Sequence, residues 1–214
     1  MAGMRRGVLG GTFDPIHIGH LILAQEALLR LSLDRVTFVP AGMPWRKSRR
    51  SVAPAADRLA MVKLAIAENP RFDVSDIEVR REGPSYIWET LAQLGEGGDE
   101  LFLILGADAL IDLPTWREPR EIVRLARIAV AGRPGWDGAT VATAAASVEG
   151  LPERIVALDM PLIEVSSTDL RVRARRGEPL RYLVPDAVAA YIRERALYPP
   201  GSSDEAPPSA SPHG

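Results

Sequence analysis

The stretch "GGTFDPIHIGH" near the N-terminus holds the residues whose types and spacing most clearly suggest chemistry. Gly10 and Gly11 end a short apolar run and permit a tight turn with close backbone approach. His17 and His20 stand three positions apart, so both can face one side of a first helical turn, and Gly19 leaves the space between them without a side chain. The N-terminus of a helix also offers N–H groups and a positive dipole end to an anion. This arrangement predicts a phosphate-binding turn.

Two other interpretations of the histidine pair stay open. Both side chains could bind zinc, but the sequence has no cysteine and its only other histidine is His213, so carboxylates would have to complete the metal shell. Both could instead pack near the core with no ligand. The motifs G-x-G-x-x-G and G-x-x-x-x-G-K-[ST] are absent, so a phosphate site here would have a different design.

A second cationic feature is "PAGMPWRKSRR" at residues 40–50, in which four of the last five residues are Arg or Lys, Lys47 among them. On charge alone, a solvated basic loop would be sufficient explanation. A loop that follows a strand of an α/β sheet overlooks the ligand crevice, however. These cations are therefore candidates to close over a polyphosphate.

The segment "EVSSTDLRVRARR" at 164–176 predicts the start of a helix. Ser166 or Ser167 suits the N-cap and Asp169 suits the first turn. Arg171 follows one turn later, so the same helix end would also suit terminal phosphates. The structural and the functional interpretation are compatible.

Three aromatic residues, Tyr86, Trp88 and Trp116, could all belong to the core, which is the usual place for such side chains. Trp116 follows Pro114 near the end of a predicted strand, where an indole could stack on a planar heterocycle. Asp108 follows the apolar run "LILGA", at a strand end where a carboxylate often meets a ribose or a base.

The elements that must position these groups alternate between strands and helices. Short apolar runs predict buried strands at 7–11, 35–41, 71–79, 100–107, 127–132 and 154–160. Helical spacing predicts helices at 20–31, 57–69, 85–94, 119–126, 140–148, 167–176 and 185–196. This alternation is typical of an α/β domain with a doubly wound parallel sheet and C-terminal helices, whose site lies at the carboxyl ends of the strands.

The composition is that of an ordinary globular protein, with 46% hydrophobic and 25% charged residues. A net charge of −2 argues against nucleic acid or an anionic membrane as partner, and no apolar run approaches the ~20 residues of a membrane span. The first residues do not resemble a signal peptide, so we expect a cytoplasmic protein. The expected domain covers 1–198, and the Pro/Ser-rich segment 199–214 is expected to be a disordered tail.

Together these segments resemble the H-x-G-H nucleotidyltransferase superfamily and, most closely, the bacterial nicotinate-nucleotide adenylyltransferase family. The resemblance covers about residues 7–198 and is carried by "GGTFDPIHIGH", "DRLAMVKLAI", "REGPSYIWETL", "LILGADALIDLPTW", "VSSTDLR" and "YLVPDAVAAYI". It implies transfer of AMP from ATP to nicotinate mononucleotide, giving nicotinate adenine dinucleotide and pyrophosphate for NAD biosynthesis. It also implies that Mg²⁺ accompanies ATP and that the protein itself fixes no metal.

The same resemblance assigns roles to individual residues. His17, His20 and Lys47 are implied to be catalytic, against the ATP phosphates. The nicotinate nucleotide is expected at Tyr86, Ile87 and Trp116. The residues expected to bind ATP are Gly10, Gly11, Thr12, Phe13, His17, Gly19, His20, Lys47, Gly106, Asp108, Ser166, Ser167 and Arg171.

The sequence departs from the family pattern at two places. Trp45 and Arg46 stand where many relatives have Pro-His before the lysine, and Ile87 stands where the family usually has threonine. The second departure removes a hydroxyl, so we expect backbone N–H groups to select nicotinate over nicotinamide. Competing functions are transfer to nicotinamide mononucleotide or phosphopantetheine, a non-catalytic nucleotide-binding regulator and, least favoured, a nucleic-acid-binding module.

Overall fold

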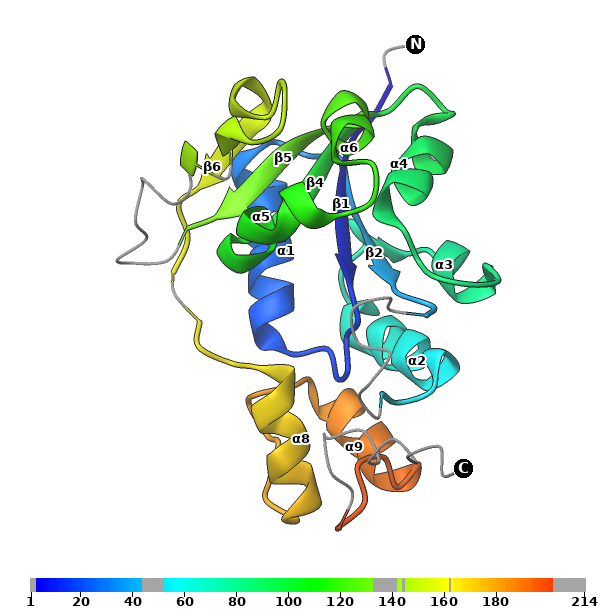
Figure 1. The fold of residues 1–214 in the computed structure, drawn as a ribbon. Helices are drawn as coiled ribbons and strands as arrows, with labels where there is room; N and C mark the ends of the chain where they lie inside the picture. The colour runs from blue at the N-terminus through cyan, green and yellow to red at the C-terminus, as the bar shows by residue number, and fades with distance from the viewer. Residues whose placement is uncertain (1–2, 44–51, 133–141, 144, 162, 202–214) are drawn as a thin grey trace, which may run out of the picture.

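One parallel sheet forms the centre of the fold (Figure 1). The computed structural model describes residues 3–43, 52–132, 142–143, 145–161 and 163–201. Within these ranges the strand order is β3-β2-β1-β4-β5-β6, so the order reverses between β1 and β4, as in a doubly wound fold. The strands are β1 (Arg5–Gly11), β2 (Arg35–Pro40), β3 (Phe72–Val74), β4 (Glu100–Gly106), β5 (Ala126–Ala131) and β6 (Ile155–Leu158).

Helices follow the strands along the chain, and two C-terminal helices lie beyond the carboxyl ends of β1 and β2 (Figure 1). The helices are α1 (Ile18–Arg30), α2 (Ala55–Ile66), α3 (Ile77–Arg80), α4 (Ile87–Gly95), α5 (Ala107–Asp112), α6 (Pro119–Leu125), α8 (Ser167–Arg175) and α9 (Asp186–Glu194). Two short 3-10 turns are η1 (Leu113–Thr115) and η2 (Pro152–Arg154). None of these described helices has the length and apolar character needed to cross a bilayer.

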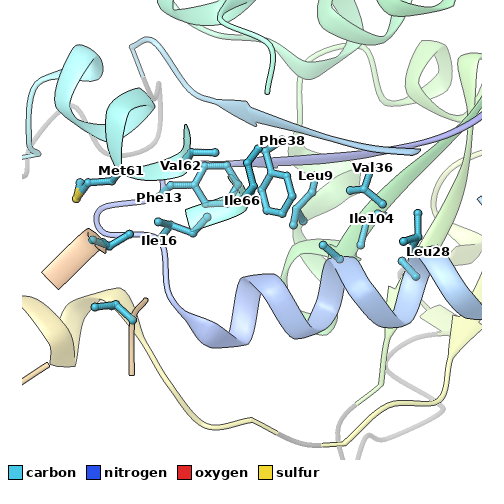
Figure 2. Close-up of a cluster of buried hydrophobic side chains, with 14 of the residues drawn as sticks. Leu9, Phe13, Ile16, Leu28, Val36, Phe38, Met61, Val62, Ile66 and Ile104 are labelled. Carbon is cyan, nitrogen blue, oxygen red and sulfur yellow. The ribbon is translucent and has the colours of Figure 1, made fainter. Parts of the chain in front are cut away.

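The sheet is buried on both faces, which explains why its strands are continuously apolar. Neighbouring residues of a strand point to opposite faces. On one face Leu9, Phe38 and Ile104 pack with Leu28 of α1 and Met61 of α2 (Figure 2). This core holds α1 beside the carboxyl end of β1, where the histidine-bearing turn lies.

The opposite face carries the second core. Val8 and Leu103, the strand neighbours of residues in the first core, pack there with Leu91 of α4 and Ile122 of α6. Trp88 and Trp116 are partly buried against this core. The expectation that these indoles belong to the core is therefore partly met: both pack against the core, but neither is fully buried.

The predicted strand at 71–79 is wrong in its second half. Ser75 N–H donates to the carbonyl of Phe38, and the Ser75 hydroxyl oxygen then accepts the N–H of Ile77 over 3.4 Å. This local turn ends the extended backbone and starts α3, since serine side chains compete for nearby backbone groups. As a result Ile77 packs in the second core and Glu78 is buried beside it.

The other predicted strands and the C-terminal helices are found close to their expected bounds. Helix α5 is not among the predicted helices: β4 ends at Gly106, one residue before the predicted end of the strand, and α5 follows at once. Of the helix expected at 140–148, Ala142, Thr143, Ala145 and Ala146 are helical. The basic residues 46–50 and the tail residues 202–214 lie outside the described ranges.

Candidate active site

A cavity of about 660 Å³ lies at the carboxyl ends of the central strands. Its wall includes Gly10 and Gly11 at the end of β1, Gly106 at the end of β4 and Ala131 at the end of β5. This is the point at which the strand order reverses, where doubly wound folds bind their ligands. The volume falls within the roughly 300–1,000 Å³ typical of small-molecule sites.

The structure brings most of the predicted site residues together around this one cavity, although they come from four separate parts of the chain. The first part is the end of β1 with the turn after it, which holds three glycines, Thr12 and both histidines. The second is the start of α4 with the tyrosine and the isoleucine, the third runs from the end of β4 to Trp116, and the fourth is the start of α8 with the serines and the arginine. The predicted residues in the wall are Gly10, Gly11, Thr12, His17, Gly19, His20, Tyr86, Ile87, Gly106, Trp116, Ser166, Ser167 and Arg171.

Two of the predicted residues that the structure describes, Phe13 and Asp108, are not in this wall. Lys47 lies outside the described residues. Phe13 is 2% exposed and belongs to the core, where its ring forms a T-shaped pair with the His20 ring at a centroid distance of 5.0 Å. Asp108 is exposed in the first turn of α5, between the wall residues Ala107 and Ala109. The catalytic and binding roles of all the predicted site residues stay predictions.

The two histidines form a stacked pair at the start of α1. Their ring centroids are 3.7 Å apart, and the His17 backbone N–H donates to Nδ1 of His20 over 3.2 Å. A neutral His20 ring must therefore carry its proton on Nε2, where it can donate to a ligand. A Cβ atom at Gly19 would lie 3.1 Å from the His17 ring, so glycine gives this ring its room. The expected arrangement of two histidines around a glycine is present.

His17 is held in its neutral form by burial. It is 7% exposed, and loss of solvent lowers its pKa from 6.5 to about 4. Its Nδ1 atom is buried and has no hydrogen-bond partner among the residues that the structure describes. At neutral pH the pair therefore acts through hydrogen bonds rather than through a full positive charge on His17.

The start of α8 lies on the same side of the cavity, beside the turn that carries His17. Ser166 is the N-cap, as one of the two predicted possibilities had it, and its hydroxyl oxygen accepts the N–H of Asp169 over 3.1 Å. Ser167 donates its hydroxyl to the carbonyl of Pro15 over 3.0 Å, which ties α8 to the turn before His17. Because both hydroxyls have protein partners, the first backbone N–H groups of α8 are the natural donors for an anion.

The remaining wall is apolar and includes one buried acid. Tyr86, Ile87 and Trp116 line it, and the indole Nε1 of Trp116 is buried without a hydrogen-bond partner in the described part of the chain. Glu78 also lines it, is 4% exposed and accepts the Thr90 hydroxyl over 2.7 Å. Burial raises the pKa of Glu78, and the hydrogen bond from Thr90 opposes that rise.

Sequence reasoning did not assign Glu78 or Ser85 to the site. Ser85 lines the cavity and also fixes the loop that follows β2, since its hydroxyl oxygen accepts the N–H of Gly42 over 3.0 Å. The predicted strand at 71–79 includes Glu78, and a strand there gives no reason to direct this side chain into the site. The dipeptide Ser75-Asp76, a common start of a helical turn, was the signal that could have corrected this.

No group of three or more His, Asp or Glu side chains is arranged to hold a metal ion within the described ranges. A zinc interpretation of the histidine pair therefore has no carboxylates from these ranges to complete it.

Comparisons with known proteins agree with this geometry. Residues 8–173 match the family model described as Cytidylyltransferase-like. A protein of Roseiflexus sp. (strain RS-1), named "Probable nicotinate-nucleotide adenylyltransferase", is 51% identical over 193 residues, covering 90% of this chain and 96% of its own. This chain belongs to the cytidylyltransferase-like family and, within it, to the nicotinate-nucleotide adenylyltransferases.

Further matches support this membership. A relative of the same name from Dehalococcoides mccartyi (strain ATCC BAA-2266 / KCTC 15142 / 195) is 45% identical over 201 residues, covering 92% of this chain and 98% of its own. Among solved structures, the Plasmodium falciparum nicotinic acid mononucleotide adenylyltransferase complexed with NaAD aligns with a TM-score of 0.71. That alignment covers 91% of this chain and 97% of the other at 17% identity, and it shows that the fold is shared.

Proposed function

We propose that this chain transfers the adenylyl group of ATP to nicotinate mononucleotide, forming nicotinate adenine dinucleotide and pyrophosphate. The observation that carries the proposal is that one cavity has two unlike walls. One wall carries the histidine pair and the start of α8, and the other carries Tyr86 and Trp116. Phosphates suit the first wall and a flat aromatic base suits the second. Named relatives at 44–51% identity across most of the chain support the same activity.

The reaction needs no covalent intermediate with the protein. An oxygen of the acceptor's own phosphate attacks the α-phosphorus of ATP, a new P–O bond forms, and the bond to the leaving pyrophosphate breaks with its electron pair. The nucleophile is already an anion, so no general base has to remove a proton. Catalysis then consists of alignment and stabilisation of charge on the phosphates.

The phosphate wall supplies that stabilisation in this proposal. The Nε2–H group of His20 donates to a phosphate oxygen of ATP, and neutral His17 supports it by stacking and by its backbone hydrogen bond. The backbone N–H groups at the start of α8 and the guanidinium of Arg171 bind the terminal phosphates. A donor placed where charge develops contributes more in such a buried site than in water.

The base wall selects the acceptor. A nicotinate carboxylate can accept two hydrogen bonds from backbone N–H groups near Ile87 and Trp116, whereas the amide of nicotinamide turns its own N–H groups toward one of those donors. One unpaired buried donor costs about 1–3 kcal/mol, so we expect the nicotinate nucleotide to be preferred roughly ten- to a hundredfold in kcat/KM.

Further parts of the proposal concern the metal, the basic loop and the location. ATP enters as its complex with a divalent cation, Mg²⁺, held by the nucleotide phosphates. Lys47 approaches the triphosphate from the basic loop, and Asp108 lies near the adenosine. The enzyme acts in the cytoplasm.

The experiment that tests this function is a coupled pyrophosphate-release assay with a panel of acceptors. Nicotinate mononucleotide, nicotinamide mononucleotide and phosphopantetheine are each offered with ATP and Mg²⁺, and omission of the acceptor is the control. We expect the highest kcat/KM with nicotinate mononucleotide. A higher value with another acceptor would assign a different function, and no release with any acceptor would leave a nucleotide-binding regulator in its place.

A further inference from the structure

A buried tyrosine near the C-terminal end of the described chain reaches the turn between β1 and α1. Tyr198 is 8% exposed, and its hydroxyl donates to Oδ1 of Asp14 over 2.7 Å, although the residues lie 184 positions apart. Asp14 is 3% exposed. Burial and the Asp14 carboxylate both raise the pKa of Tyr198, so its hydroxyl keeps its proton and remains a donor. The contact joins the C-terminal segment to the turn that precedes His17.

Asp14 is also in contact with Arg171 of the cavity wall. Nη1 of Arg171 donates to the backbone carbonyl of Asp14 over 2.8 Å, whereas its distance to the carboxylate Oδ2 is 3.9 Å. The guanidinium is thus hydrogen-bonded to a backbone oxygen, while the carboxylate lies beyond hydrogen-bond distance of Nη1. Two donors hold Oδ1: the Tyr198 hydroxyl and, at 3.3 Å, the N–H of Ala53.

Arg58 is the second buried arginine of this region, and its hydrogen bonds go elsewhere. Its Nε, Nη1 and Nη2 atoms donate to backbone carbonyls, over 3.0, 2.7 and 3.0 Å respectively, of Ala53, Thr12 and Gly42. It balances the Asp14 charge at longer range but does not fix the position of the carboxylate. The Tyr198 hydroxyl makes the shortest hydrogen bond to that carboxylate among the described residues.

We propose that Tyr198 is a positioning residue for the anion site: its hydroxyl keeps the ion pair between the Asp14 carboxylate and Arg171 as long as 3.9 Å, so that the guanidinium can bind phosphate. This role rests on the proposed function. Opposite charges attract strongly where solvent is excluded. A carboxylate released by loss of the hydroxyl would rotate toward Arg171 and compete with the ligand for it. The C-terminal segment is therefore part of the machinery that binds ATP, although Tyr198 itself does not line the cavity.

Tyr191 offers a matched control. Its hydroxyl donates to Oδ1 of Asp57 over 2.8 Å, and Asp57 is 6% exposed and absent from the cavity wall. Tyrosine-to-phenylalanine substitution at either position removes one hydroxyl and one hydrogen bond to a buried carboxylate. Only the bond made by Tyr198 involves a carboxylate in contact with Arg171.

Isothermal titration calorimetry with inorganic tripolyphosphate tests the anion site without the acceptor. We expect Tyr198→Phe to raise the Kd roughly three- to tenfold, the range for one hydrogen bond, and Tyr191→Phe to leave it unchanged. Thermal melts check that both variants are folded. An unchanged Kd in Tyr198→Phe, or an equal rise in both variants, would overturn the inference. If the wild-type protein does not bind tripolyphosphate, the proposed function is overturned as well.

A second variant keeps the test decisive if the single variant does not fold. In Tyr198→Phe/Asp14→Asn the side chain at position 14 has no charge with which to attract Arg171. We expect its Kd for tripolyphosphate to equal the wild-type value or to fall below it. A Kd threefold or more above the wild-type value would show that the loss does not act through the Asp14 charge, and would overturn the inference.

Discussion

The two walls of the cavity are built on different principles. At the phosphate wall the side chains are tied to the backbone: His20 accepts from His17, Ser167 donates to Pro15 and Arg171 donates to Asp14. The base wall is mainly apolar, and the buried indole N–H of Trp116 has no acceptor among the described residues.

This difference suggests a division of work. The phosphate wall is held in place before any ligand binds, which is the condition for stabilising a transition state without reorganisation. The base wall gains part of its hydrogen bonding only from the ligand, which is the condition for selecting one ligand over another. Changes at the first wall should therefore lower kcat, and changes at the second should lower kcat/KM for the acceptor.

The largest effect is expected from His20→Ala. Loss of one well-placed donor at the phosphate wall should lower kcat by at least ~10²-fold while the fold survives. Gln25→Ala is a suitable control, since Gln25 is a polar residue of the same helix that does not line the cavity. Steady-state kinetics with saturating acceptor measures the effect. A folded variant with near-wild-type kcat would remove His20 from the catalytic role.

The buried state of His17 predicts how stability depends on pH. Its pKa is lowered to about 4 in the folded protein, so between pH 6.5 and 4 the unfolded chain binds the proton first. The contribution of neutral His17 to the free energy of unfolding is therefore fully present above pH 6.5. It is lost as the pH falls through 4, and the total loss is about 3 kcal/mol.

Urea unfolding at pH 7 and pH 4 measures this loss. His17→Asn is the comparison, because it removes the titrating group while other acidic groups titrate in both proteins. The wild-type protein should lose more stability than the variant over this range. Equal losses, or an NMR titration of the His17 ring near pH 6.5, would contradict the buried neutral form.

The sheet and the phosphate wall could largely be predicted from the sequence. The pattern of apolar runs predicts the doubly wound sheet. A sheet of this kind places the turn between β1 and α1 at the carboxyl ends of the strands, where the site is expected. Local motifs such as H-x-G-H carry their geometry within one helical turn, so His17 and His20 were placed correctly beside the cavity.

The parts that were missed depend on contacts between distant residues. Glu78 enters the base wall because Ser75 ends the edge strand after Val74, and the further apolar residues Ile77 and Val79 made the strand look longer than it is. Phe13 has a positive φ of 49°, which no local pattern predicted, and its ring is in the core. The bond from Tyr198 to Asp14 joins polar residues far apart in sequence, and no hydrophobic period marks such a pair.

An intermediate effect is expected at the base wall. Trp116→Ala should lower kcat/KM for nicotinate mononucleotide about tenfold, within the roughly 1–3 kcal/mol that stacking on one base contributes. The KM for ATP should stay unchanged if the two walls act separately. Trp116→Phe keeps an aromatic face and should recover most of the loss. An equal loss in both variants would show that the indole N–H, rather than the ring face, makes the contribution.

The smallest effect is expected from removal of the tail. Residues 202–214 contain no apolar side chain larger than Ala or Pro, so they can bury little surface against the domain. A chain that ends at Gly201 keeps Tyr198 and its bond to Asp14, and its kcat should equal that of the full chain, with a Tm within about 2 °C.

A chain that ends at Leu197 differs only by four further residues but loses that bond and a buried ring, so its Tm and its affinity for ATP should both fall. A drop of several degrees in the longer truncation product would mean that the tail packs on the domain. Equal behaviour of the two products would mean that the C-terminal segment does not support the phosphate wall.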